Sequence, residues 1–147
     1  DKENLSLKGV SNVINKNSGM QGISEISSDM RDLELAYYEG NEMASLALTM
    51  YAYRVKKFIG AYAAIMNGVD CIIFTGGVGE NDFNIRRMIL QNMEYTGLLF
   101  DEVANHGVKG EDKLISKPDS KVLAAVIRTN EELLIASDTY KILEKCV

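Results

Sequence analysis

Apolar side chains recur at intervals of three and four residues over the long segment 43–66, and this spacing predicts an amphipathic helix. The positions of the expected buried stripe are Met43, Ala47, Met50, Tyr51, Val55, Phe58, Ile59, Tyr62, Ala63 and Met66. Asn67 and Gly68 follow directly, and this pair is typical of the end of a helix. We therefore expect one long helix with an apolar face.

Two short apolar runs have the character of strands in a parallel sheet. Residues 71–75 and 121–127 are partly β-branched, which is typical of strands that are covered on both faces. A helical pattern follows each run, over 81–93 after the first and from Thr129 after the second. The repeated order of strand, turn and helix predicts an α/β layer. Residues 97–120 are expected to be mostly irregular.

Weaker patterns predict two helices in the first forty residues. Apolar positions over 5–14 are compatible with a short helix, which ends in the polar turn 15–19. Ser and Asp side chains in 27–32 stand just before another helical pattern and can accept hydrogen bonds from its free N–H groups. We expect a second helix to begin there.

Composition and charge narrow the class of protein. The chain has 147 residues, of which 46% are hydrophobic and 25% charged, as expected for one soluble globular domain. Sixteen Lys and Arg residues against 21 Asp and Glu residues give a net charge of -5, which disfavours nucleic acid and anionic membranes as partners. No stretch approaches the roughly 18 apolar residues of a spanning helix.

The two cysteines point to a reducing compartment. Cys71 and Cys146 lie far apart, and neither belongs to a metal-binding or CxxC spacing. Cys71 opens the first apolar run and is expected to be a small buried hydrophobic residue. Together with the absence of a signal peptide at residues 1–4, this pattern leads us to expect a cytoplasmic protein.

The glycine-rich segment Gly76-Gly77-Val78-Gly79-Glu80-Asn81 is the clearest candidate site. It stands where a buried strand passes into a helix, the position at which open α/β sheets usually bind ligands. Glycines allow a tight turn and a close approach, and the N–H groups of the next helix suit phosphate. A tight turn without a ligand is an equally good interpretation of the glycines alone. The segment is neither a Walker A motif nor a GxGxxG fingerprint.

Two other segments carry chemistry that is compatible with a nucleotide and a metal. Thr129 and Glu132 fit a capping box, which would leave Glu131 as a spare carboxylate able to hold Mg²⁺. Asp29 offers a cap carboxylate, and the flat guanidinium of Arg31 could stack on a purine. Helix capping and a surface ion pair are the simpler interpretations of these two segments.

Four separated segments, taken in order, closely resemble the acetate kinase family. They are Ser-Ser-Asp-Met-Arg-Asp at 27–32, the basic and aromatic segment 53–62, Phe-Thr-Gly-Gly-Val-Gly-Glu-Asn at 74–81 and Thr-Asn-Glu-Glu-Leu at 129–133. The resemblance covers nearly the whole chain. It implies that residues 1–147 are the C-terminal part of the nucleotide-binding domain of an acetate kinase. The implied fold is the α/β ribonuclease-H-like ATPase domain shared by acetate and sugar kinases and actin, here incomplete.

The resemblance also implies roles for individual residues. The ligands would be ATP or ADP and Mg²⁺. Asp29, Met30 and Arg31 would border the adenine and ribose. The residues implied to meet the nucleotide elsewhere are Gly77, Val78, Gly79, Glu80 and Asn81, and Glu131 would help to hold Mg²⁺. One departure from the family pattern is Arg128, because the family more often has proline at that position.

The family resemblance predicts an incomplete enzyme. Family members are much longer and place the acetate pocket and the catalytic aspartate, arginines and histidine upstream, so no catalytic residue is expected in this chain. Phosphoryl transfer depends on positioning and charge neutralisation, so the chain alone is expected to be inactive. In the full-length enzyme, acetate or another short carboxylate would be phosphorylated reversibly to an acyl phosphate. The sheet is expected to have an unfilled edge.

Two alternatives stay open. A propionate or butyrate kinase would share the same nucleotide side, because the acyl-chain pocket lies outside this chain. A noncatalytic dimerisation module would use the apolar stripe of the long helix to pair with a second copy, and a homodimer is expected in either case.

Overall fold

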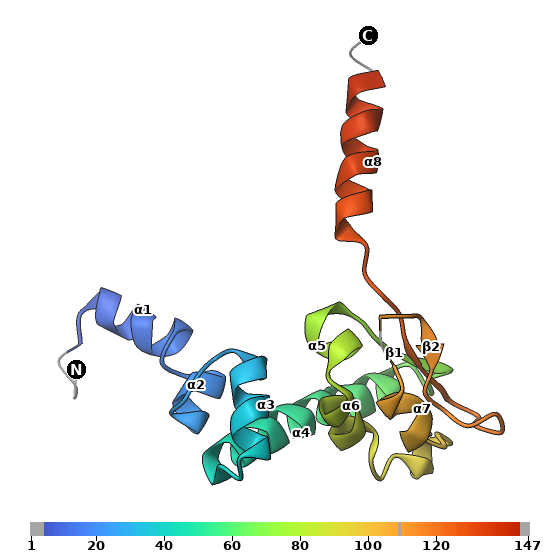
Figure 1. Ribbon diagram of the computed structural model, residues 1–147, viewed down its shortest axis with the longest axis horizontal. Coiled ribbons are helices and arrows are strands. Elements are labelled where there is room, and N and C mark those ends of the chain that lie inside the picture. Colours follow the sequence, from blue (N-terminus) through green and yellow to red (C-terminus); the bar gives the residue numbers. More distant parts are fainter. Residues whose placement is uncertain (1–4, 109, 145–147) are drawn as a thin grey trace. The chain divides into compact units, whose positions relative to one another are not determined.

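The computed structural model describes residues 5–108 and 110–144 and combines helices with a small sheet (Figure 1). Its elements are α1 (Leu7–Asn15), α2 (Gly19–Ser24), α3 (Met30–Tyr38), α4 (Glu42–Ile65), β1 (Cys71–Phe74), α5 (Gly76–Asn81), α6 (Phe83–Leu90), a 3₁₀ turn (Glu94–Thr96), α7 (Glu102–His106), β2 (Lys113–Leu114), β3 (Leu123–Val126) and α8 (Glu131–Glu144). The chain divides into two compact units. One contains residues up to 69 together with 84–92, and the other contains 70–83 together with the residues from 93 onward.

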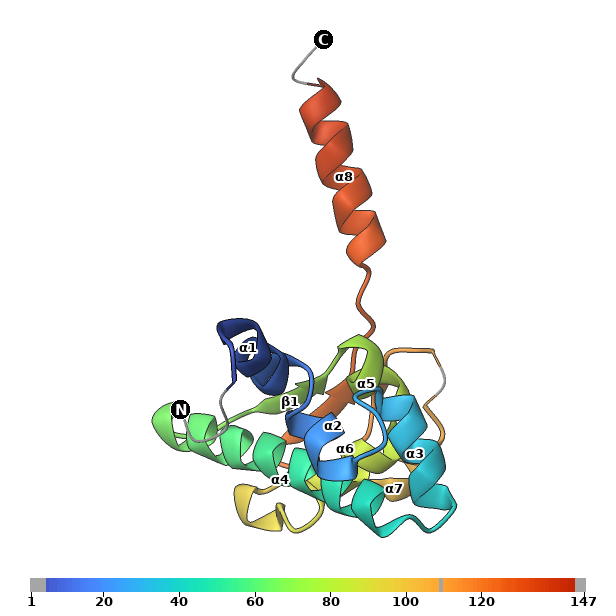
Figure 2. The same cartoon turned by 90° about the vertical axis from the view of Figure 1, so that its left-hand side faces the viewer.

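In the first unit, α2 and α3 pack against the long helix α4 (Figure 2). The length of α4 agrees with the prediction, but Ala47 is the one residue of the predicted stripe that is fully buried. Small residues form most of the buried face of α4, which consists of Ala44, Ala47, Leu48 and Ala52. Phe58 and Tyr62 of the predicted stripe are 51% and 59% exposed. Short side chains allow helices to approach closely, so packing selected the alanines and left the larger residues outside.

Helix α4 ends at the Asn67-Gly68 pair as predicted, and it begins at a cap that was not predicted. The Asn41 side chain accepts hydrogen bonds from the N–H groups of Met43 and Ala44 and thereby caps α4. At the other end, Asn67 and Gly68 have φ angles of 59° and 128°, the left-handed conformation that ends a helix. The short helix α2 has no counterpart among the predicted elements.

The second unit contains the sheet, with strand order β1-β3-β2 among the described residues. The first two of these strands are parallel, and β2 is antiparallel to β3. This arrangement confirms the predicted α/β layer. In the described part of the chain β1 has a strand partner on one side, which agrees with the expected unfilled edge.

Strand β3 is buried on both faces as predicted, because Ala124, Ala125 and Val126 are all buried, but β1 is covered less completely. Burial alternates along β1, and Ile73 is 58% exposed, so only one face of this strand is covered. Cys71 is half-buried instead of fully buried, and it is a free cysteine. Cys146 lies outside the described residues. The buried residues of these two strands are Ile72, Phe74, Ala124, Ala125 and Val126.

The segment after β1 folds differently from the single helix predicted over 81–93. The glycines themselves form the helical turn α5, and the chain bends at Asp82, where φ is -97° and ψ is 94°. Helix α6 then begins at Phe83. In the predicted irregular region, α7 and the pair Lys113–Leu114 add a short helix and a short strand. Helix α8 follows β3 as predicted.

Within residues 5–108 and 110–144, no helix has both the length and the hydropathy needed to cross a membrane.

Candidate functional site

The parallel pairing of β1 and β3 brings the carboxyl ends of both strands to the same edge of the sheet. Phe74 at the end of β1 is in register with Val126 at the end of β3. The N–H of Ile127 then donates to the carbonyl oxygen of Phe74 at 2.9 Å. The turns that follow the two strands therefore start side by side, at the edge where open α/β sheets bind ligands.

A hollow of about 420 Å³ lies between these two turns. Gly76 and Gly77 line it from the turn after β1, and Thr129, Asn130, Glu131 and Glu132 line it from the turn after β3. The fold thus joins the predicted glycine segment and the predicted acidic segment, which are about fifty residues apart in sequence. Of the predicted site residues, Gly77 and Glu131 meet here.

Glycine serves a different purpose at each of the three positions in this turn. Gly76 has a φ of 71°, a conformation that residues with a side chain adopt only at a cost. A Cβ at Gly79 would lie 3.2 Å from the carbonyl carbon of Phe74, so this glycine allows the turn to pack closely on β1. A Cβ at Gly77 would have no neighbour within 4 Å and would enter open space. Gly76 likewise has no neighbour within 4 Å of such a Cβ, so both glycines leave their side of the hollow open.

The Glu80 carboxylate ties the two turns together. Its Oε1 accepts hydrogen bonds from the Gly76 N–H at 2.9 Å and from both the N–H and the hydroxyl of Thr129 at 2.8 Å. The bonds from Thr129, followed by the bond from Gly76 and the charge of Arg128, hold the pKa of the Glu80 carboxyl below its usual value. The carboxylate is therefore ionised in the neutral pH range.

The predicted capping box at Thr129 and Glu132 is wrong. In a capping box the Glu132 carboxylate would accept from the Thr129 N–H, but that N–H donates to Glu80. The side chain of Asn130 caps α8 instead, and its Oδ1 accepts from the Leu133 N–H at 3.0 Å. Glu131 and Glu132 are both exposed, so both carboxylates are left at the mouth of the hollow.

The remaining predicted residues of the glycine segment serve its local structure. The Asn81 amide donates to the Gly77 carbonyl oxygen at 2.9 Å, and the Val78 carbonyl oxygen accepts from the Asp82 N–H at 3.0 Å. Gly79 lies against Phe74, as described above. These contacts fix the path of the backbone on which Gly77 stands.

Asp29, Met30 and Arg31 belong to the other compact unit, at the start of α3. The guanidinium of Arg31 donates to both carboxylate oxygens of Asp29, at 3.1 and 2.6 Å, and the N–H of Arg31 donates to Asp29 as well. The Arg31 side chain lowers the pKa of Asp29 to about 2, first through its hydrogen bonds and then through its charge. Arg31 is nevertheless 87% exposed, so a face of its guanidinium stays accessible.

Arg128 has a structural role that sequence reasoning missed. Its backbone N–H donates to the Asp112 Oδ1 at 2.9 Å, and its Nε lies 3.5 Å from the same oxygen. A proline at this position could not provide the backbone bond. The departure from the family pattern is thus accompanied by a contact that fixes the end of β3 next to the segment before β2.

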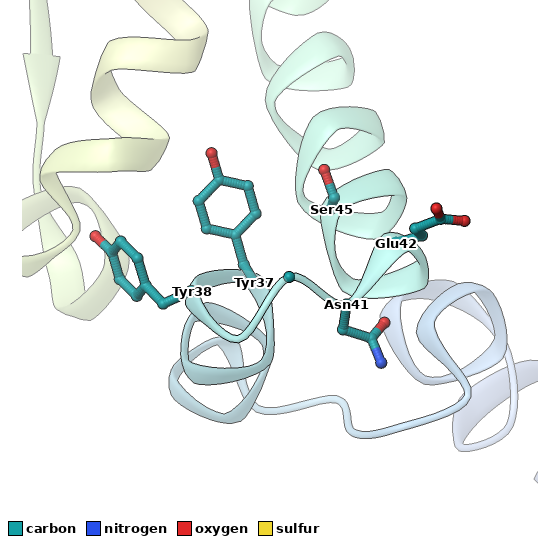
Figure 3. A pocket seen from close by; sticks show the side chains of 6 residues that line it. Tyr37, Tyr38, Asn41, Glu42 and Ser45 are labelled. Atoms are coloured by element: carbon teal, nitrogen blue, oxygen red, sulfur yellow. The ribbon is translucent and has the colours of Figure 1, made fainter.

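A second hollow, of about 470 Å³, lies at the turn between α3 and α4 and was not predicted (Figure 3). Its lining residues are Tyr37, Tyr38, Gly40, Asn41, Glu42 and Ser45. The Asn41 amide is used to cap α4, and the Tyr38 hydroxyl accepts a hydrogen bond from the Asn84 amide. In Figure 3 the Tyr37 ring and the Ser45 hydroxyl point away from the side occupied by the Asn41 amide. Because two of its polar groups hold the fold together, we assign this hollow no chemistry.

The described chain gathers no group of three or more His, Cys, Asp or Glu side chains that could hold a metal ion. Mg²⁺ differs from zinc in this respect, because it commonly binds through one or two carboxylates and completes its shell with waters and substrate phosphates. Glu131 and Glu132, placed opposite Gly77, fit that kind of site.

Sequence comparison identifies a family. The model of the acetokinase family matches residues 1–137. An acetate kinase from Bacteroides thetaiotaomicron is 56% identical over 145 residues, which are 99% of this chain and 36% of that protein. An acetate kinase from Porphyromonas gingivalis strain W83 is 52% identical over 144 residues. The chain spans about a third of the length of these curated relatives.

Solved structures agree with the sequence comparison. The crystal structure of the Porphyromonas gingivalis acetate kinase superposes with a TM-score of 0.88 at 52% identity, covering 97% of this chain and 36% of that one. An acetate kinase from Entamoeba histolytica gives 0.84 at 29% identity, with 95% and 37% covered. A propionate kinase from Francisella tularensis gives 0.79 at 35% identity, with 92% and 34% covered. The fold is therefore part of an α/β domain of the acetate and sugar kinase superfamily.

Proposed function

Because this chain belongs to the acetokinase family, we propose that it forms the nucleotide-binding side of an ATP-dependent acetate kinase. In the full protein the reaction would transfer a phosphoryl group reversibly between ATP and acetate, with acetyl phosphate as the product. The observation that carries the proposal is the hollow at the carboxyl ends of β1 and β3. There an unobstructed glycine, Gly77, and the acidic residue Glu131 line the same space.

The two sides of the hollow suit different parts of a Mg-nucleotide. The open backbone at Gly77 allows a phosphate or sugar to approach without meeting a side chain. Glu131, with Glu132 beside it, would hold Mg²⁺ directly or through water, and the ion would neutralise charge on the transferring phosphoryl group. Val78, Gly79, Glu80 and Asn81 would support this contact by fixing the backbone of the turn.

Asp29, Met30 and Arg31 are proposed to border the adenine and ribose. The exposed guanidinium of Arg31 is held in one orientation by Asp29, and a flat, fixed guanidinium is well suited to stack on a purine. Replacing Arg31 with Lys would keep the charge but remove the flat surface.

Calorimetric titration with Mg-ATP tests the nucleotide assignment. The unmodified chain should bind, and Gly77→Trp and Glu131→Ala should each weaken binding, because one fills the hollow and the other removes a metal ligand. Asp138→Asn is a matched control, since Asp138 is ion-paired with Lys141 on the surface of α8. Absence of binding by the unmodified protein, or binding unaffected by both changes, would refute the assignment.

The identity of the acid needs the full protein. The propionate kinase from Francisella tularensis resembles this chain at 35% identity, so propionate or butyrate kinase is the alternative. The full protein should phosphorylate acetate faster than propionate or butyrate at equal concentration. Equal or better use of butyrate would reject acetate as the preferred substrate. The chain alone should show no turnover, because no catalytic group for the carboxylate is assigned to it.

An exposed apolar stripe on α4 favours homodimerisation as a further property. The exposed fractions run from 41% to 80% over Met43, Leu46, Met50, Tyr53, Phe58, Tyr62 and Ile65 of α4 and over Met66 at its C-cap. Phe58 and Tyr62 stack with their ring centroids 6.4 Å apart and form an aromatic centre to this stripe. Exposed apolar patches of this kind mark interaction sites. Sedimentation velocity should give a dimer that Phe58→Glu dissociates; a wild-type monomer would refute the proposal.

We place the enzyme in the cytoplasm. The free cysteine Cys71 fits a reducing compartment, and ATP is available there.

A further inference from the structure

Glu80 stands between the two turns that line the hollow, and it is the only acidic residue of the segment 76–81. One of its oxygens, Oε1, accepts three hydrogen bonds, two of them from Thr129. Hydrogen bonds to a charged acceptor are stronger than neutral ones. This carboxylate therefore holds the turn after β1 against the turn after β3.

The hydrogen bonds of Glu80 lie just beyond the end of the backbone pairing between β1 and β3. The parallel pairing of β1 and β3 ends at Phe74 and Val126, and the Ile127 N–H makes the next backbone bond, to Phe74. Beyond that point, Glu80 connects Gly76 on one side with Thr129 on the other. Gly77 and Glu131, the two residues assigned to the ligand, each stand close in sequence to one of these anchor points.

A direct role for Glu80 on the nucleotide fits the geometry less well. Phosphates are anions, and a carboxylate facing them would repel them unless a cation lay between. Oε1 is already engaged by three donors, and Glu80 is not among the residues that line the hollow. The arrangement resembles the way in which outer groups orient metal ligands without touching the metal.

We propose that Glu80 is a positioning residue, which sets the separation of Gly77 and Glu131 and thereby shapes the site for Mg-nucleotide. This inference rests on the proposed nucleotide function. It assigns Glu80 and Thr129 to one hydrogen-bonded unit, so loss of either partner should damage the same step. The Thr129 hydroxyl donates to Glu80, and a change at Thr129 tests the same unit from its other side.

The experiment uses the full protein and compares Glu80→Gln, Thr129→Val and Thr129→Ser. Glu80→Gln keeps the shape but removes the charge, and Thr129→Val keeps the shape but removes the hydroxyl. Each should raise the KM for Mg-ATP roughly 10- to 100-fold, the range found when groups that orient metal ligands are removed. The KM for the acid should stay unchanged. Thr129→Ser retains the donor and should restore near-wild-type values, which a purely structural role for the threonine methyl group would not allow.

A double-mutant cycle separates positioning from direct contact. If Glu80 acts by placing the Glu131 carboxylate, Glu80→Gln should weaken Mg-ATP binding much less in a Glu131→Ala background than in the wild type. Fully additive effects would overturn the proposal, as would a wild-type KM for Mg-ATP in Glu80→Gln. Circular dichroism confirms that each variant is folded, and Asp138→Asn serves as the charge-matched control.

The outcomes distinguish the positioning role of Glu80 from the proposed binding of Mg-nucleotide. If Gly77→Trp and Glu131→Ala leave Mg-ATP binding unchanged, the nucleotide assignment fails. If those variants weaken binding and the Glu80 and Thr129 variants do not, only the positioning role fails.

Discussion

Gly77 and Gly79 both belong to α5, but they should respond in opposite ways to substitution by alanine. A Cβ at Gly79 would lie 3.2 Å from the carbonyl carbon of Phe74 and 3.5 Å from its Cα and Cβ. At least one of these contacts is tighter than normal, and the backbone of β1 is the neighbour that would have to move. A Cβ at Gly77 would meet nothing within 4 Å.

The expected free energies follow from these contacts. Alanine is favoured over glycine in a helix by up to about 1 kcal/mol, and both positions lie in α5. Gly77→Ala should therefore leave the free energy of unfolding unchanged or raise it by up to about 1 kcal/mol. At Gly79 the overpacking cost of about 1–3 kcal/mol opposes that gain, so the net change should be a destabilisation of up to about 2 kcal/mol.

Nucleotide binding should show the reverse order of severity once stability is taken into account. The methyl group of Gly77→Ala enters the hollow where the ligand is proposed to approach the backbone. We expect the Kd for Mg-ATP to rise about tenfold, equivalent to about 1.4 kcal/mol. Gly79→Ala should affect binding only as far as it disturbs the fold.

Urea denaturation followed by circular dichroism measures the first quantity, and calorimetric titration with Mg-ATP measures the second. A Gly77→Ala protein that is folded and binds Mg-ATP as tightly as the wild type would refute the placement of the ligand. A Gly79→Ala protein more stable than the wild type would refute the steric argument.

Three further predictions concern the fold around the site. Asn41→Ala removes the cap of α4 and should lower the free energy of unfolding by about 1 kcal/mol in a urea titration, whereas Asn41→Ser should recover most of the loss. Because the pKa of Asp29 falls from 3.8 to about 2 in the folded chain, the contribution of its pair with Arg31 is complete above pH 3.8 and is lost as the pH falls through about 2. Between pH 3.8 and about 2 the urea midpoint of Asp29→Asn should therefore drop by less than that of the wild type. The difference should be small because the ion pair is exposed and screened. Equal drops in the two proteins would contradict the assignment. Arg128→Pro removes the N–H that donates to Asp112 and should lower the thermal midpoint, and Arg128→Lys, which keeps the backbone bond, should not.

The sequence predicted most elements of the fold because their signals are local. The apolar runs that became β1 and β3, the cap at Asp29 and the Asn67-Gly68 stop were all readable from short segments. The buried face of α4 was not. Helix α4 is apolar on most of its circumference, so large residues such as Phe58 dominate the periodic pattern, whereas close helix packing selects the alanines.

The sequence predicted residues of the candidate site but not how they come together. Sequence predicted Gly77 and Glu131 separately, but their meeting depends on the parallel pairing of β1 with β3. The capping box was wrong because Thr129 has two possible hydrogen-bond partners. In the motif the Thr129 N–H donates to Glu132, yet in the structure it donates to Glu80, about fifty residues away in sequence. No local pattern reveals a competition between a neighbour and a distant carboxylate.

Helix α8 has no buried side chain over Glu131–Glu144. Even its apolar residues Leu133, Leu134 and Ile135 are each more than 60% exposed. Isolated helices of roughly 12–15 residues are marginally stable in water, so α8 depends on its own hydrogen bonds and on the Asn130 cap. Its amide protons should therefore exchange with deuterium much sooner than those of β3. Glu131 stands in the first turn of α8. Binding of Mg-ATP to Glu131 should therefore order α8 and slow the exchange of its amide protons.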